Sequence, residues 1–111
     1  MPEIEVTQVS VHMQTIIRRL AEESQKAKGL IDSMATATQA YKKGRAVRSL
    51  VHKADGMAVT LIKHQAEGDA SQLEAEMIVA TQTLKAHFCK REDLRAQLNG
   101  YQSINKHLDN I

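Results

Sequence analysis

The sequence predicts an all-α protein, an antiparallel three-helix, coiled-coil-like bundle with a short fourth helix at the C-terminus. Aromatic residues make up only 3% of the chain, which is atypical of sheet proteins because strands favour aromatic and β-branched side chains. Helix-favouring Ala, Gln, Lys, Glu, Leu and Met are common. Apolar residues also recur with a 3.5-residue period. The 111 residues fit one domain, residues 1–111.

The first helix is expected over residues 10–42. Alternate steps of four and three residues from Met13 define an apolar stripe, as in helices that pack along their length. The stripe consists of Met13, Ile17, Leu20, Ser24, Ala27, Ile31, Met34, Thr38 and Tyr41. Lys42 and Lys43 precede Gly44, and basic residues often precede a glycine that ends a helix. We therefore expect the helix to end there.

Residues 1–9 fit two structures. The alternation of β-branched residues in "IEVTQVSV" suits an extended arm. Pro2, followed by Glu3 and Glu5, instead suits the first turn of a helix, where proline and acidic residues are favoured. The first helix would then extend to the start of the sequence.

Two further helices and a short C-terminal one are expected over residues 45–66, 71–98 and 101–110. Ser71 with Glu74 fits a capping box, and Asn99-Gly100 is a strong turn signal. Gly56 falls inside the second helix, where it costs about 1 kcal/mol relative to Ala. The two stripes are Val47, Leu50, Ala54, Met57, Leu61 and His64, then Leu73, Met77, Ala80, Leu84, His87, Arg91, Leu94 and Leu98.

The unequal helix lengths predict apolar surface that the chain does not cover evenly. At 1.5 Å per residue the first helix spans roughly 50 Å and the second only about 33 Å. Either the C-terminal helix folds back over the excess or another chain covers it, and we favour a homodimer or a partner complex. The expected partner face consists of Met13, Ile17, Leu20, Leu98, Tyr101, Ile104 and Leu108.

The stretch "YKKGRAVRSLVHK", residues 41–53, holds five Lys or Arg and no acid. If Gly44 ends a helix, Arg45 and Arg48 enter the first turn of the next one, where free N–H groups bind anions. The candidates for binding an anion, an acidic partner or nucleic acid are Lys42, Lys43, Arg45, Arg48, His52 and Lys53. In the alternative, structural interpretation, the helix runs through Gly44, or Arg48 and His52 pair with an acid such as Asp55.

No catalytic residue, metal site or cofactor is predicted, and we expect a protein that is not an enzyme. His64 and His87 lie on the apolar stripes, and with Cys89 they could hold a metal. However, His87 and Cys89 are two residues apart and point to different faces of a helix, so structural histidines are favoured. The sequence contains no Cys-x-x-Cys, no His-Glu-x-x-His and no phosphate-binding loop.

The single cysteine excludes an intrachain disulfide and fits a reducing compartment. Residues 1–14 lack the pattern of a secretory signal, and no apolar run approaches the ~20 residues that span a bilayer. A cytoplasmic location without membrane insertion is expected.

These observations predict a non-enzymatic protein-interaction module, such as an adaptor, a chaperone-like protein or a regulatory or assembly subunit. It would bind another protein or a second copy through its apolar heptad face. The alternative function is a small nucleic-acid-binding accessory protein that uses residues 42–53 as a dimer. The net charge of +2 is small for nucleic-acid binding, so that alternative depends on local charge.

Overall fold

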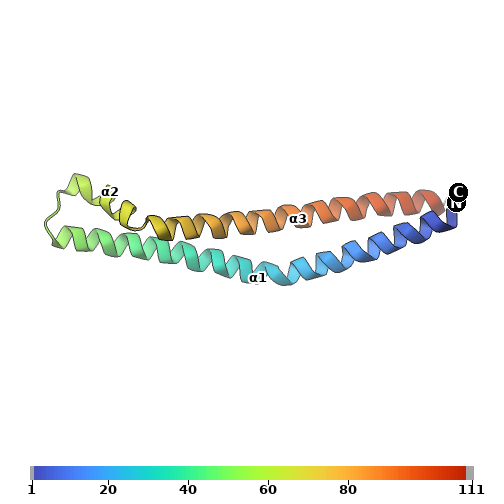
Figure 1. Ribbon diagram of the computed structural model, residues 1–111, viewed down its shortest axis with the longest axis horizontal. Helices are drawn as coiled ribbons and strands as arrows, with labels where there is room; N and C mark the ends of the chain where they lie inside the picture. The colour runs from blue at the N-terminus through green and yellow to red at the C-terminus, as the bar shows by residue number, and fades with distance from the viewer. Residues whose placement is uncertain (1, 110–111) are drawn as a thin grey trace. The chain divides into compact units, whose positions relative to one another are not determined.

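The computed structural model describes residues 2–109, and it describes side chains from residue 7 onward. It contains α1 (Pro2–Ala54), α2 (Val59–Asp69) and α3 (Ser71–Asp109), with no strand among the described residues (Figure 1). The predicted all-α class is therefore confirmed. The chain divides into a terminal unit, whose described residues are 2–27 and 85–109, and a central unit, residues 28–84.

The first helix is longer than predicted at both ends. It begins at Pro2, which confirms the helical alternative for residues 2–9, and it continues through Gly44 to Ala54. A Cβ atom at Gly44 would lie 2.6 Å from Leu73 Cδ1, so the missing side chain lets α1 approach the start of α3. Gly44 therefore serves close packing, and the prediction that it ends a helix is wrong.

Gly56 occupies the break between α1 and α2. Its φ of +80° lies in the left-handed region, which glycine adopts without steric cost. The N–H groups of Gly56 and Met57 donate to the carbonyls of Lys53 and His52 at 3.1 and 3.0 Å, which satisfies the end of α1. The prediction that residues 45–66 form one helix through Gly56 is wrong, and α2 spans only Val59–Asp69.

The third helix begins at Ser71, as predicted, and continues through Asn99-Gly100 to Asp109. Residues 101–109 are the end of α3, so the separate fourth helix is wrong. The half-buried positions Leu98, Tyr101 and Leu108 continue the stripe across Gly100, so packing outweighs the local turn signal.

Within each unit, α1 runs antiparallel to the segment that it contacts. In the terminal unit the His12 and Tyr101 rings stack with centroids 5.3 Å apart, and Glu23 contacts His87. In the central unit Gly44 lies against Leu73, and His52 contacts Asp69 at the end of α2. Residues later in α1 thus meet residues earlier in the following helices.

The burial pattern confirms the predicted stripe of α3 and shifts that of α1. Every position predicted for α3, from Leu73 to Leu98, is buried or half-buried. In α1 the packed positions include Ile16, Glu23 and Leu30, whereas the predicted Ile17 and Ile31 are exposed. From Met13, steps of four then three residues select Ile17, whereas steps of three then four select Ile16. Both orders have the same 3.5-residue period, so the period alone does not show which residues face the core.

In the part of the chain that the structure describes, none of the helices combines the length and the apolarity that crossing a bilayer requires.

Candidate interaction site

The basic segment, residues 42–53, lies in the interior of α1 and not at the start of a helix. Its backbone N–H groups are therefore engaged in the helix, because only the first four of a helix are free. The anion site that the sequence suggests at Arg45 and Arg48 depended on a helix beginning there, and that element of the prediction is wrong.

Arg48 and His52 both contact Asp69, the last residue of α2. Arg48 Nε donates to Asp69 Oδ2 at 3.1 Å, and His52 Nε2 lies 2.5 Å from the same oxygen. Gln65 Nε2 donates to Asp69 Oδ1 at 3.3 Å. The bonds from His52 and then Arg48 lower the pKa of Asp69, although partial burial opposes them. The predicted pairing with an acid is observed, but the acid is Asp69 and not Asp55.

Arg45 is engaged within α1. Its guanidinium carbon lies 5.1 Å from the centre of the Tyr41 ring, and Nη1 donates to the Tyr41 hydroxyl at 3.4 Å. A cation over an aromatic face one helical turn away is a local stabilising contact. Arg45 is also half-buried, so it is less available to a partner than the neighbouring lysines.

Lys42, Lys43 and Lys53 are exposed, and within the described part of the chain they make no ion pair. The structure therefore divides the six basic candidates into two groups. Arg45, Arg48 and His52 have intramolecular partners, whereas the three lysines have none among the described residues.

Lys43 stands at the edge of a groove with a volume of about 440 Å³ in the central unit, the Lys43 groove. Its lining residues are Ala40, Lys43, Gly44, Val47, Arg48, Asp69, Ala70 and Leu73. Five of these eight carry aliphatic side chains or none, so apolar walls stand beside two cations and one paired carboxylate. Such a groove suits an apolar side chain better than a small ion.

An apolar stripe of α1 faces solvent beside this groove. Val47 is 47% exposed and Leu50 is 67% exposed, and Val51 is exposed as well. These residues share one helix face, at spacings of three and four. The sequence predicts them to be core residues, but the side of α1 that meets α2 carries Arg48 and His52, which pair with Asp69, and Val47, Leu50 and Val51 are left exposed.

The predicted partner face falls in the terminal unit, where its residues divide into two sets. Met13, Leu20 and Leu98 are half-buried, whereas Ile17 and Ile104 are exposed. A groove of about 330 Å³ brings Tyr101, Ile104 and Leu108 together with Gln8, Val9 and His12.

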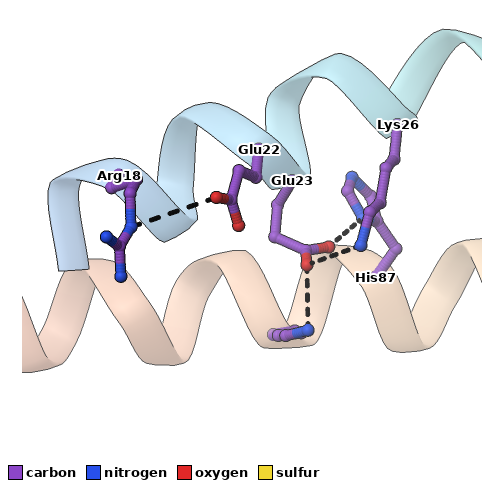
Figure 2. Close-up of polar contacts among 6 residues, drawn as sticks. Arg18, Glu22, Glu23, Lys26 and His87 are labelled. Carbon is purple, nitrogen blue, oxygen red and sulfur yellow. Dashed lines mark hydrogen bonds and ion pairs between the residues drawn. The ribbon is translucent and has the colours of Figure 1, made fainter. Parts of the chain in front are cut away.

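Glu23 is a buried carboxylate of the terminal unit, and a cluster of polar side chains surrounds it (Figure 2). Lys90 Nζ lies 2.8 Å and Lys26 Nζ 3.3 Å from Oε1, and His87 Nδ1 lies 3.1 Å from Oε2. The hydrogen bond from Lys90, with those from Lys26 and His87, lowers the pKa of Glu23 to about 2 against the opposing effect of burial. An ionised carboxylate only accepts, so the His87 Nδ1 carries the proton.

The burial of Glu23 and His87 indicates that this cluster has a structural role. The side chains of Glu23 and His87 are 8% and 3% exposed, and neither lines a groove described above. By contrast, the nearby pair of Arg18 and Glu22, 4.0 Å apart, is exposed (Figure 2). Glu23 is not among the residues predicted from the sequence, because the predicted stripe of α1 passes through Ser24. Val9 and Ile16 lie 14 and seven residues before Glu23. This heptad spacing is the signal that would have placed Glu23 among the packed positions of α1.

The possible metal ligands do not gather. His64 and Cys89 are exposed, and His87 contacts Glu23. Among residues 7–109, whose side chains the structure describes, no group of three or more His, Cys, Asp or Glu side chains is arranged to hold a metal ion.

Comparison with known proteins gives no relative on which to base a function. The sequence matches no family model, and it is significantly similar to no curated protein and to no solved structure.

Proposed function

We propose that this protein is a non-enzymatic helical protein-interaction module that binds another protein through apolar helix faces. One observation carries the proposal: twelve large apolar side chains are exposed among the described residues, and eight of them lie in the central unit. Exposed apolar residues that share a helix face are typical of surfaces that meet a partner.

The exposed residues of the central unit lie on all three helices. They are Ile31, Val47, Leu50, Val51, Val59, Leu61, Ile78 and Val79. Burying Leu50 or Val47 against a partner helix would contribute about 1.5–3 kcal/mol for each fully covered side chain. Helices supplied by the partner would complete the coiled-coil-like bundle that the heptad stripe predicts.

A substitution at Leu50 tests this function. Leu50→Glu places a charge in the centre of the exposed stripe and leaves the intrachain contacts of α1 in place. Partners are captured from the native source and identified by crosslinking and mass spectrometry. We expect them to bind Leu50→Glu about 10–100-fold more weakly than the native protein. Gln82→Glu, a change at an exposed position of α3, is the control and should retain them.

Light scattering over a concentration series then identifies the partner class. A mass that doubles with concentration, and no longer does so in Leu50→Glu, indicates a second copy of the chain. Captured partners that bind Leu50→Glu and the native protein equally well, together with a constant monomer mass, would contradict the proposal.

A small nucleic-acid-binding protein is a second candidate function. Lys42, Lys43 and Lys53, which are exposed and make no ion pair with any described residue, favour it. Phosphate contacts make such binding strongly salt-dependent, so affinity for duplex and single-stranded DNA is measured from low to high salt. Absence of binding at low salt eliminates this candidate and leaves the protein-interaction function unaffected.

A further inference from the structure

We propose that the Lys43 groove binds an amphipathic helix from another protein, one whose apolar face is bordered by acidic side chains. This inference rests on the proposed function and specifies the chemistry of the partner. All the side chains that line the groove belong to the central unit.

The walls of the groove indicate that the partner helix presents an apolar face. Val47, Ala70 and Leu73 present aliphatic side chains, and Gly44 presents none. A Cβ atom at Gly44 would fall 2.6 Å from Leu73 Cδ1, so α1 lies close to the start of α3 at this point. The exposed Leu50 and Val51 extend the apolar surface along α1. A single Leu or Ile side chain of the partner therefore fits the groove, and its neighbours fit the stripe.

The charges around the groove indicate that acidic side chains border the apolar face of the partner helix. Lys43 makes no ion pair within the described part of the chain, and the one salt bridge described for Arg48 is made through Nε. Asp69, the one acid that lines the groove, already contacts Arg48 and His52. The lining of the groove therefore carries an excess of positive charge, from Lys43, that carboxylates of the partner would complement.

The same charges argue against a second copy of this chain at this surface. In a twofold-symmetric contact the same patch meets itself, so this surface, whose unpaired charge is positive, would meet a second positive surface. Like charges at an interface are unfavourable. Nucleic acid would use the lysines but would leave the apolar walls unused.

A designed peptide provides a direct test. The probe is a fluorescein-labelled helix of about 15 residues, roughly 22 Å long, with Leu at alternate spacings of three and four and Glu beside each Leu. A second peptide has Lys in place of every Glu, and a third has the leucines of the first moved off one face. Binding to the full-length protein is measured by fluorescence anisotropy at low and high salt.

We expect the acidic peptide to bind at least tenfold more tightly than the other two, and the difference to shrink at high salt because the charges are exposed. Lys43→Glu should weaken its binding about tenfold or more, and Val47→Ser should also weaken it. Lys28→Glu, the same charge change on an exposed residue of α1 outside the groove, should leave it unchanged.

The remaining outcomes separate the hypotheses. Equal binding of the acidic and basic peptides overturns this inference but supports apolar docking, and so leaves the proposed function standing. No binding of the acidic peptide, or equal binding to Lys43→Glu and Lys28→Glu, overturns the inference alone. Binding of DNA that Lys43→Glu abolishes, without binding of the acidic peptide, assigns the surface to nucleic acid.

Discussion

His87 Nδ1 of α3 lies 3.1 Å from Glu23 Oε2 of α1, and both side chains are at least nine-tenths buried. A polar pair at a seam position otherwise occupied by apolar residues restricts how two helices align, because any other register leaves a buried group without its partner. The Glu23–His87 pair therefore favours the observed alignment of α1 against α3 in the terminal unit.

The lowered pKa of Glu23 predicts a loss of stability in acid. The pKa is about 2 in the folded protein and 4.5 in the absence of its partners. The folded state thus holds fewer protons at this residue, and the contribution to the free energy of unfolding is fully present above pH 4.5 and is lost as the pH falls toward 2. Urea unfolding between pH 2 and 6 should show this decline. Glu23→Gln should remove that part of the pH dependence, whereas Glu22→Gln, at an exposed position, should retain it.

The continuation of α3 through Gly100 predicts a stabilising substitution. Apart from its chain neighbours and the backbone of its own helical turns, no atom lies within 4 Å of a Cβ built at Gly100, and its φ is not positive. Gly100→Ala should raise the free energy of unfolding by about 0.5–1 kcal/mol, because Ala favours the helix and restricts the unfolded chain. Gly56→Ala should lower it by about 1 kcal/mol, because the φ at that position is +80°. If Gly100→Ala were as destabilising as Gly56→Ala, a turn would exist at residue 100.

The contacts of Asp69 predict a local effect on α2. Asp69→Asn removes the carboxylate that accepts from His52 and Arg48, and these contacts hold the end of α2 against α1. Amide hydrogen exchange in residues 59–69 should therefore become faster. Asp55→Asn is the control, because Asp55 is exposed in the link after α1 and does not pair with these two residues. Unchanged exchange of α2 in Asp69→Asn would show that the pairs do not hold it in place.

The fold class and the stripe of α3 could be predicted from the sequence because both depend on local periodicity. Leu73, Leu84 and Leu94 belong to an unbroken heptad pattern, and one phase of that pattern satisfies all of them. The helix ends were predicted less well because a glycine has several uses. Gly44 packs against Leu73, and only Gly56 adopts the left-handed conformation that ends a helix.

The candidate site could be predicted only in part, because its geometry depends on which residues of α1 meet residues of α2 and α3 in the central unit. The basic residues of the segment, including Lys43 and Arg48 of the groove, could be recognised from the sequence. Asp69, Ala70 and Leu73 could not be recognised as their neighbours, because a single helix was expected over residues 45–66. Arg48 pairs with Asp69 while Val47 and Leu50 stay exposed, and local sequence patterns do not determine which side of α1 meets α2.

The phase of α1 yields a prediction that compares two neighbouring isoleucines. Ile16 is 4% exposed and Ile17 is 52% exposed, although the sequence stripe favoured Ile17. Ile16→Ala should lower the free energy of unfolding by about 2–5 kcal/mol, because it removes buried methyl groups and leaves a cavity. Ile17→Ala should change it by less than about 0.5 kcal/mol, as expected of an exposed site. Urea unfolding of the two variants at equal protein concentration measures both values. A larger loss for Ile17→Ala would reverse the phase of α1 and move Glu23 out of the seam.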